Sequence, residues 1–501
     1  MVQFLSPVPY GYALETLPCA LPRCDISDDL NLEAIASETF KDFPRLISQD
    51  LTNDAIWRDT FALTGSLRTF YSAQSVLQAW RELVSSHEAT DFVLTPRSAR
   101  VMRSGEDFAW INMAFTFETA AEPQTECAGF LSLVPGKDGS WKIWLLRTVL
   151  EQLKGQPNVN ELQPVVNSVE PAVNGIHGHS ATNASLTVKV NGHGDQTTFD
   201  CVVVGAGQAG LGTAGRLKAL GVSYVVLDRN AKVGDNWMLR YDSARLHTVR
   251  EYAHLPFNRT FPLPYQEFLT KHDLAKGYQA WVDTFDINVW LSTNVESGSW
   301  DEERRLWTLN IGRNGSSQVL TCRHVVMAVG AGGQVPVMPQ YPDRELFQGD
   351  VLHSAQFKTA NPWKGRVGIV VGTANTAHDV AEDMLDADLS SVTMIQRGTT
   401  DVLPYEYFQK FSSGIYNEHV PTEVADRISY TMPLGVGRLS LMNAMHAMAA
   451  KEPERFDALE RAGFRVERYP DLSYALSERL GGHYIDVGAS KKIGDGLVGA
   501  R

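Results

Sequence analysis

Residues 201–210 join an apolar strand to three closely spaced glycines, a combination suited to binding the pyrophosphate of a dinucleotide. The strand runs directly into a GxGxxG loop made of Gly205, Ala206, Gly207, Gln208, Ala209 and Gly210. Glycine lets the backbone turn tightly and approach a phosphate, and a helix starting near Gln208 directs free amides at it. The following apolar strand ends at Asp228, where a carboxylate binds ribose hydroxyls and repels a 2'-phosphate. The pattern predicts an FAD site, with NAD as the alternative.

A second loop of the same kind begins at Gly372. Its candidate nucleotide-binding residues are Gly372, Thr373, Asn375 and Thr376. Ala374 stands where the first loop has a glycine, and the strand after the loop ends in Arg397 in place of an acid. A planar guanidinium suits a 2'-phosphate, so this loop predicts NADPH.

Composition limits the classes of function that remain. The 501 residues are enough for two or three domains, and 44% hydrophobic with 21% charged residues is ordinary for a globular protein. The net charge of -13 argues against nucleic acid or an anionic membrane as the main partner. No run reaches the ~20 apolar residues that span a bilayer, and the N-terminal residues lack the basic start of a secretory leader. We therefore expect a cytoplasmic protein without a membrane span.

Cysteine usage and missing motifs narrow the chemistry further. The five cysteines are scattered and include no CxxC pair, as is typical of a reducing compartment. A flavoprotein disulfide reductase needs a paired dithiol, so that class is excluded. The sequence also lacks HExxH and GxSxG motifs, and we predict no metal site and no serine nucleophile.

The chain divides into five expected segments. Residues 1–155 form a small α+β domain, 156–198 a flexible linker rich in polar residues, 199–345 the first segment of an FAD-binding domain, 346–480 an NADPH-binding domain inserted into it, and 481–501 the start of a C-terminal FAD-domain segment. The fold class is α/β, with two doubly wound Rossmann-like domains.

The N-terminal segment predicts helices over 30–48 and 75–86, a strand over 108–118 and a hairpin turn over 135–140. In the strand, alternate apolar residues point to one face and polar residues such as Asn112 to the other, as in a half-buried sheet. Helices followed by a curved antiparallel sheet resemble the cone-shaped NTF2-like fold. We expect a docking or oligomerisation module, and hence a homodimer, from this domain.

Between the loops lies the stretch Phe347-Gln-Gly-Asp-Val-Leu-His353-Ser-Ala-Gln-Phe357. It matches the FxGxxxHxxx(F/Y) fingerprint of flavin-containing monooxygenases. Together with the two loops in this order, it makes residues 200–488 resemble the two-dinucleotide members of that family, nearest to the YUCCA-type and related fungal enzymes.

The resemblance implies roles for particular residues. Asn236, Trp237, Arg245 and His247 would line the flavin beside the first loop and Asp228. His247 is the candidate catalytic residue, because a histidine handles protons near neutral pH. The second loop and Arg397 would hold NADPH.

The resemblance also implies a reaction. NADPH reduces FAD, the reduced flavin captures O2, and the C4a-hydroperoxide inserts one oxygen atom into a small organic substrate. One alternative is a Baeyer–Villiger-type ketone monooxygenase. Another is a C-terminally truncated, non-catalytic relative that acts as an interaction module, because relatives continue well beyond the position of Gly488.

Overall fold

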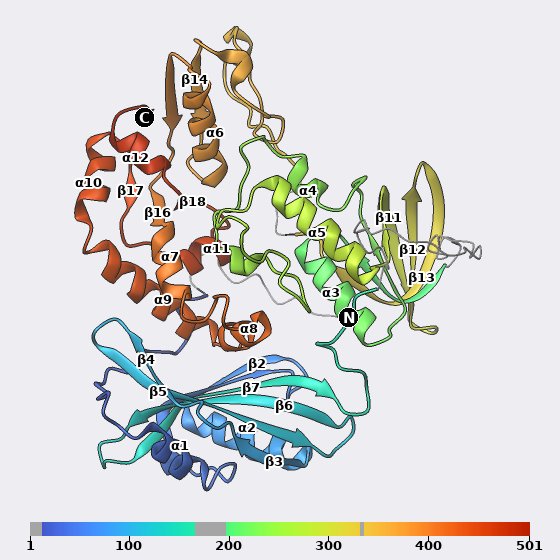
Figure 1. Ribbon diagram of the computed structural model, residues 1–501, viewed down its shortest axis with the longest axis vertical. Coiled ribbons are helices and arrows are strands. Elements are labelled where there is room, and N and C mark those ends of the chain that lie inside the picture. The colour runs from blue at the N-terminus through green and yellow to red at the C-terminus, as the bar shows by residue number, and fades with distance from the viewer. Residues whose placement is uncertain (1–12, 166–196, 331–334) are drawn as a thin grey trace, which may run out of the picture. The chain divides into compact units, whose positions relative to one another are not determined.

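The computed structural model describes residues 13–165, 197–330 and 335–501. The chain forms two compact units, shown in Figure 1. Unit 1 comprises residues 1–156, 242–252 and 356–501, and unit 2 comprises residues 157–241 and 253–355. Among the described residues, every helix is too short or too polar to span a bilayer.

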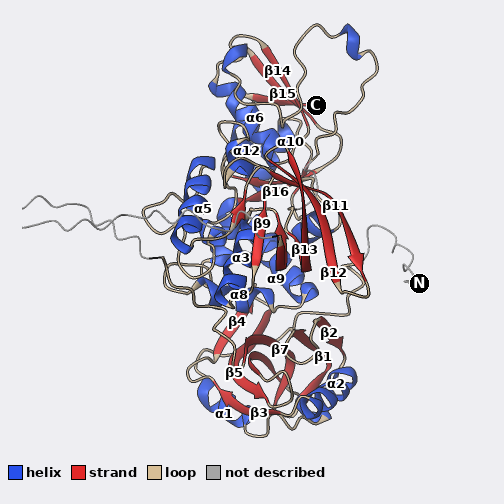
Figure 2. Ribbon diagram, turned by 90° about the vertical axis from the view of Figure 1, so that its right-hand side faces the viewer, coloured by secondary structure: helices blue, strands red, loops and turns tan. Residues whose placement is uncertain are grey.

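The N-terminal part of unit 1 is a seven-stranded sheet in the order β2-β1-β7-β6-β5-β3, with β4 also paired to β5. Adjacent strands in this sheet are antiparallel, except that β1 and β7 are parallel to each other. The helices α1 and α2 lie against one side of it (Figure 2). The elements are α1 Leu32–Phe40, β1 Leu51–Thr60, β2 Leu67–Tyr71, α2 Ala73–Ser86, β3 Ala89–Leu94, β4 Arg100–Ser104, β5 Phe108–Thr119, β6 Thr125–Pro135 and β7 Trp141–Leu153.

This arrangement confirms the helix over 75–86, the strand and the hairpin expected in the N-terminal segment, whereas the helix expected over 30–48 ends at Phe40. The strand's predicted apolar face is buried, since Ile111, Met113, Phe115 and Phe117 are at most 1% exposed. The prediction of a half-buried strand holds at Thr116, which is exposed, and at Glu118, which is half-buried, and it was wrong at Asn112, which is only 4% exposed. The NTF2-like topology stays a prediction.

Part of the second face of the sheet is buried because helices from the C-terminal half of unit 1 pack against it. Val436 of α9 belongs to one apolar cluster with sheet residues such as Trp110 and Trp144. These contacts join positions about 300 residues apart, so no local pattern in the sequence could reveal them.

A fully buried arginine, Arg147 of β7, lies at this interface. Its Nη1 donates to the carbonyl of Ile428 at 2.9 Å and to Thr431 Oγ1 at 3.2 Å, and its Nη2 donates to Asn112 Oδ1 at 3.1 Å. The guanidinium also lies 4.4 Å from the centroid of the Phe130 ring. Burial lowers the pKa of Arg147 to about 9. The cation therefore relies on one helix-end carbonyl, two neutral side-chain oxygens and an aromatic ring, which are weaker partners than a carboxylate.

Unit 2 is built on a six-stranded sheet in the order β10-β9-β8-β13-β12-β11. The first four strands are parallel, and β11 to β13 form an antiparallel meander. This confirms the first predicted strand–loop–helix–strand unit, β8-α3-β9. The elements are β8 Thr198–Val204, α3 Gln208–Ala219, β9 Tyr224–Leu227, α4 Asp235–Met238, α5 Lys271–Phe285, β10 Val289–Trp290, β11 Thr293–Asp301, β12 Leu306–Arg313 and β13 Ser316–Met327.

The rest of unit 1 contains two three-stranded parallel sheets, β14-β15-β19 and β17-β16-β18. The first includes the second predicted strand–loop–helix–strand unit, β14-α6-β15. The elements are β14 Val367–Val371, α6 Asn375–Asp386, β15 Ser391–Ile395, β16 Thr400–Pro404, α7 Tyr405–Ser412, α8 Thr422–Tyr430, α9 Leu434–Ala449, α10 Pro453–Arg461, β17 Val466–Glu467, α11 Leu472–Ser477, β18 His483–Asp486, α12 Ala489–Gly494 and β19 Val498–Ala500.

The two units divide the chain differently from the expected segments. Residues 481–501, expected to begin a further FAD-domain segment, supply β18 and β19, which pair with β16 and β15 of unit 1. Residues 242–252 also belong to unit 1. Most of the predicted linker, residues 166–196, lies outside the described residues.

We predict that Arg147→Ala lowers the free energy of unfolding by about 3 kcal/mol, because it leaves a cavity and removes the donors to buried acceptors. Arg68→Ala on β2 is the control, since Arg68 is exposed and should change stability by less than about 0.5 kcal/mol. Chemical denaturation of both variants measures the difference. Equal effects would show that the buried contacts of Arg147 do not stabilise unit 1.

Candidate functional site

The first glycine loop is shaped by contacts that exclude any side chain. Gly205 has φ +108°, and a Cβ there would lie 2.4 Å from the carbonyl oxygen of Ala328. A Cβ on Gly210 would lie 1.8 Å from the carbonyl oxygen of Gly205. Helix α3 starts at Gln208, so its first-turn amides lack helical acceptors and face the loop. The backbone therefore forms a cradle that fits a pyrophosphate.

Asp228, directly after β9, is held beside this cradle. Its Oδ2 accepts a hydrogen bond from the Ala206 amide at 2.7 Å, and its Oδ1 accepts one from the Asn230 amide at 2.8 Å. These bonds fix the carboxylate at the end of the strand, where a dinucleotide presents its ribose.

Two further predicted residues belong to the same unit. Asn236 lies beside Gly207, since a Cβ on that glycine would be 3.9 Å from Asn236 Nδ2. Trp237 follows on α4, and the guanidinium of Arg240 stacks 4.9 Å from its ring centroid. The structure thus brings Asn236 and Asp228 to the first loop, as expected.

The backbone of the second loop follows the same path as that of the first loop, but fewer neighbouring atoms crowd its glycine. Gly372 has φ +116°, and a Cβ there would meet nothing within 4 Å. Ala374 has φ -88° and ψ -179°, close to the φ -83° and ψ -173° of Gly207. Since this backbone is extended and Ala374 is exposed, its methyl group causes no strain. Thr373 Oγ1 lies 2.6 Å from Thr400 Oγ1 of β16.

The start of helix α6 is tied to a strand far away in the sequence. Asn375 Oδ1 accepts a hydrogen bond from the Ile485 amide of β18 at 2.9 Å. The other end of the side-chain amide, Nδ2, is thereby turned away from β18. Thr376 is the next residue in the first turn of α6.

Arg397 lies just beyond the end of β15, and its side chain is exposed. The backbone before it is braced by Arg465, whose Nη2 donates to the carbonyl of Gln396 at 2.5 Å. Gln396 in turn donates through Nε2 to the carbonyl of Arg465 at 2.7 Å. The Arg397 guanidinium is therefore accessible at the strand end where a 2'-phosphate would lie.

Arg245 and His247, predicted to lie beside the first loop, contact the helix of the second. Arg245 pairs with Glu382 of α6 at 3.4 Å. His247 Nε2 lies 2.9 Å from Asp379 Oδ1, and its Nδ1 lies 3.1 Å from the carbonyl oxygen of Ile485. These partners are more than 130 positions away in the sequence, which is why the motif around Arg245 did not reveal them.

Sequence reasoning missed His378, which is fully buried in α6. Its ring stacks on Tyr484 of β18 with centroids 3.6 Å apart and planes 3° from parallel. Nδ1 donates to the carbonyl of Ala374 at 3.1 Å, and among the described residues Nε2 has no hydrogen-bond partner. Burial lowers the pKa of His378 to about 4, so the ring is neutral. The sequence could have indicated this position, because His378 lies four residues after Ala374. On a helix, that spacing places the ring beneath the loop.

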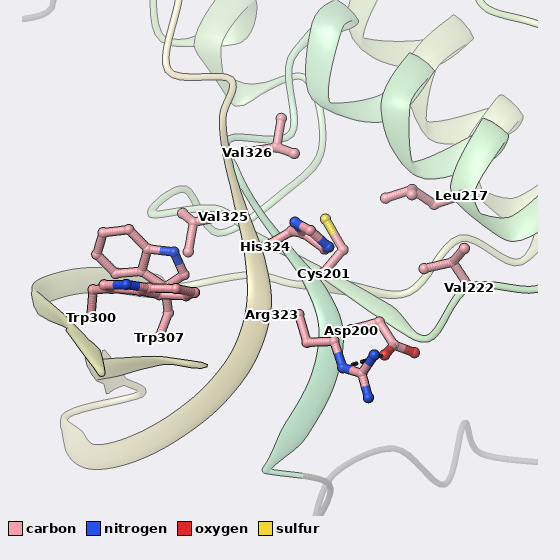
Figure 3. A pocket seen from close by; sticks show the side chains of 10 residues that line it. All are labelled: Asp200, Cys201, Leu217, Val222, Trp300, Trp307, Arg323, His324, Val325 and Val326. Carbon is pink, nitrogen blue, oxygen red and sulfur yellow. Dashed lines mark ion pairs between the residues drawn. The ribbon is translucent and has the colours of Figure 1, made fainter. Parts of the chain in front are cut away.

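Unit 2 also contains an open hollow of about 990 Å³, seen in Figure 3. Two neighbouring indoles, Trp300 and Trp307, form one wall, and Cys201 and His324 lie across from them. Arg323 pairs with Asp200 at 3.6 Å near its edge. The lining contains no residue of the glycine loop, so the hollow is separate from the dinucleotide cradle.

Residues 202–413 match the family model described as pyridine nucleotide-disulphide oxidoreductase. The matched stretch contains both glycine loops. The comparison therefore agrees with the prediction that these loops bind nucleotides. All five cysteines are free in the structure.

The curated relatives are flavin monooxygenases by name. The probable indole-3-pyruvate monooxygenase YUCCA3 of Arabidopsis thaliana is 33% identical over 235 residues, covering 45% of this chain and 53% of the relative. Indole-3-pyruvate monooxygenase YUCCA8 of Oryza sativa subsp. japonica is 29% identical over 235 residues, with 45% and 55% covered. These matches confirm the predicted resemblance to the YUCCA type. The chain spans about half the length of the curated relatives it matches.

Solved structures give the same class of neighbour. Cyclohexanone monooxygenase from Rhodococcus sp. Phi1 bound to NADP+ is 19% identical, with 61% of this chain and 64% of that chain covered and a TM-score of 0.42. The flavin-containing monooxygenase from Stenotrophomonas maltophilia is 22% identical, with 47% and 68% covered and a TM-score of 0.38. TM-scores below 0.5 do not establish a common arrangement of the whole chain.

We predict that Gly210→Ala destabilises unit 2 by about 1 to 3 kcal/mol, because the new Cβ collides with the Gly205 carbonyl and forces the backbone to shift. Gly212→Ala is the matched control on the same helix, where the nearest atom to a Cβ is Pro256 Cδ at 3.7 Å. That change should be neutral or stabilising by up to about 1 kcal/mol. Thermal unfolding distinguishes them, and equal midpoints would contradict the close approach of α3 to β8.

We predict a loss of stability below neutral pH that depends on His378. Its folded pKa is depressed to about 4, whereas the unfolded value is about 6.5. Stability from the neutral ring is therefore complete above about pH 6.5 and falls as pH drops towards 4, by about 2 kcal/mol between pH 7 and pH 5.

Denaturation of wild type and His378→Gln at these two pH values measures the effect. The variant should lose about 2 kcal/mol less than wild type on acidification. His419→Gln, at an exposed histidine, should keep the wild-type dependence. An unchanged dependence in His378→Gln would contradict the depressed pKa.

Proposed function

We propose that this protein is an FAD- and NADPH-dependent monooxygenase that transfers one oxygen atom from O2 to a small organic substrate. The observation that carries the proposal is the pair of glycine loops, each leading into a helix N-terminus and each followed by a strand that ends in a different charge. Asp228 after the first loop favours ribose hydroxyls, and Arg397 after the second favours a 2'-phosphate. The names of the YUCCA-type relatives support the reaction class.

The residues of the first loop fit FAD by the shape of their backbone. Gly205 and Gly210 leave room where a side chain would collide, and the start of α3 supplies amides to the pyrophosphate. Asp228, already oriented by the Ala206 and Asn230 amides, would accept hydrogen bonds from the adenosine ribose.

In the second loop, Thr373, Asn375, Thr376 and the first turn of α6 would hold the pyrophosphate of NADPH, and Arg397 its 2'-phosphate. Bound FAD, reduced by NADPH, supplies the reaction with O2. The protein's part is to orient the two nucleotides and exclude water.

We also propose two finer points. The five free cysteines support a reducing, cytoplasmic location. Self-association through the N-terminal part of unit 1 is the expected route to a homodimer, and light scattering coupled to size-exclusion chromatography tests it.

The proposed function is tested on the purified chain. We expect it to carry flavin, seen as visible absorbance and identified as FAD after release, and to oxidise NADPH with consumption of O2. Substrates are then screened by mass spectrometry for products that gain one oxygen from labelled O2. A protein that never binds flavin or NADPH would contradict the proposal and favour a non-catalytic relative.

We predict that Arg397→Ala weakens NADPH binding by about 10- to 100-fold, because a charge-assisted hydrogen bond to phosphate is worth about 1.5 to 3 kcal/mol. Binding of NADH should be nearly unchanged, since NADH lacks the 2'-phosphate. Arg366→Ala, at an exposed arginine just before β14 and hence at the other end of the sheet, is the matched control. Equal losses for NADPH and NADH in Arg397→Ala would show that this residue does not read the 2'-phosphate.

A further inference from the structure

A buried histidine–aspartate pair lies directly behind the second glycine loop. His247 is 6% exposed and Asp379 is 4% exposed. The Nε2 atom of His247 contacts both carboxylate oxygens of Asp379, at 2.9 and 3.1 Å. The Nδ1 atom faces the carbonyl oxygen of Ile485 at 3.1 Å. Both ring nitrogens thus face oxygen atoms, an arrangement satisfied by an imidazolium that donates to a carboxylate and to a carbonyl.

The position of Asp379 makes its charge important for anion binding. It is the fifth residue of α6, and side chains on a helix lean towards its N-terminus. An uncompensated carboxylate there would offset the positive end of the helix that a phosphate uses. His247 cancels this charge within hydrogen-bond distance.

His247 also acts on the loop through β18. Its Nδ1–H holds the carbonyl of Ile485, and the amide of the same residue donates to Asn375 Oδ1 at 2.9 Å. Both backbone polar groups of Ile485 are therefore engaged. The Ile485 amide in turn holds Oδ1 of Asn375 in the first turn of α6.

Other contacts keep His247 in place. Arg245, two residues before it, pairs with Glu382 of α6 at 3.4 Å, and the Asp242 amide donates to the carbonyl of Lys358 at 2.8 Å. Arg245 and His247 thus tie the segment 242–252 to α6, and Asp242 ties it to Lys358. Both protonatable atoms of His247 are engaged by protein acceptors, which favours a fixed ion-pair partner over a group that exchanges protons with a substrate.

We propose that His247 is a positioning residue for the second dinucleotide loop: it neutralises Asp379 beneath the N-terminus of α6 and sets the Asn375 amide through Ile485. This inference rests on the proposed function, because it assigns the loop a dinucleotide phosphate as ligand. It differs from the proton-handling role beside the flavin that the sequence predicted. The pyrophosphate is common to NADP+ and NAD+, so the effect should be the same for both.

Calorimetric titration of the purified chain with NADP+ and with NAD+ tests the proposal. His247→Gln removes the charge that His247 offers to Asp379, and we expect both dissociation constants to rise about tenfold or more, which corresponds to at least about 1.4 kcal/mol. Asp379→Asn removes the carboxylate and should leave affinity unchanged or improved. The double variant His247→Gln with Asp379→Asn should recover affinity to within about threefold of wild type, because the carboxylate that His247 compensates is removed as well.

The controls separate the other roles. His419→Gln in unit 1, at an exposed histidine, should leave both constants unchanged, and Arg397→Ala should affect NADP+ only. A drop in turnover with unchanged dissociation constants in His247→Gln would overturn the proposal in favour of a catalytic role. Weak binding in Asp379→Asn, or no recovery in the double variant, would overturn it in favour of a purely structural pair.

The test also separates this inference from the function on which it rests. If the wild-type chain binds neither NADP+ nor NAD+, the proposed function fails and the inference fails with it. If wild type binds them and His247→Gln binds them equally well, only the inference fails. Should His247→Gln not fold, the Asp379→Asn result alone decides, since a tenfold loss there contradicts charge neutralisation.

Discussion

The contact between Gly210 and the Gly205 carbonyl is the constraint on which the first nucleotide site depends. A Cβ at this point would lie 1.8 Å from the carbonyl oxygen, so α3 can approach β8 only because residue 210 is glycine. That approach directs the first amides of α3 into the turn and leaves Ala206 within 2.7 Å of Asp228. The close contact between Gly210 and the Gly205 carbonyl therefore positions Asp228, the turn and the start of α3 together. Hydrogen bonds between polar side chains contribute little to this arrangement.

The second loop solves the same problem with polar side chains. Ala377 stands at the position that corresponds to Gly210, and its methyl group shows that α6 does not need so close an approach. The glycine that remains, Gly372, would meet nothing if it carried a Cβ. Hydrogen bonds to residues outside the loop hold it instead: the hydroxyls of Thr373 and Thr400 bond to each other, and the Ile485 amide donates to Asn375 Oδ1. The geometry of this loop consequently depends on β16 and β18, which follow it in the chain.

This difference explains which features the sequence could predict. Glycine spacing, strand ends and the hairpin at 135–140 are set by residues close together in the chain, and their patterns predicted β8, α3, β14, α6 and the turn between β6 and β7 correctly. Asp228 and Asn236 were likewise expected beside the first loop. The partners of Arg245 and His247, the burial of Asn112 and the pairing of β18 and β19 depend on contacts between distant positions. Such contacts leave no local pattern, so the sequence alone did not reveal them.

The buried polar groups of unit 1 share one physical role. Arg147 joins β7 to the end of α8, His247 joins the 242–252 segment to α6, and His378 stacks α6 on β18. Each is a polar or charged group in an apolar setting, where a group without partners costs far more than one with them. Such groups hold one arrangement of the elements, because any shift breaks hydrogen bonds that water cannot replace. Apolar packing alone allows small displacements of one element against another. We therefore attribute the position of the second loop more to the contacts of His247 and His378 than to the apolar core around it.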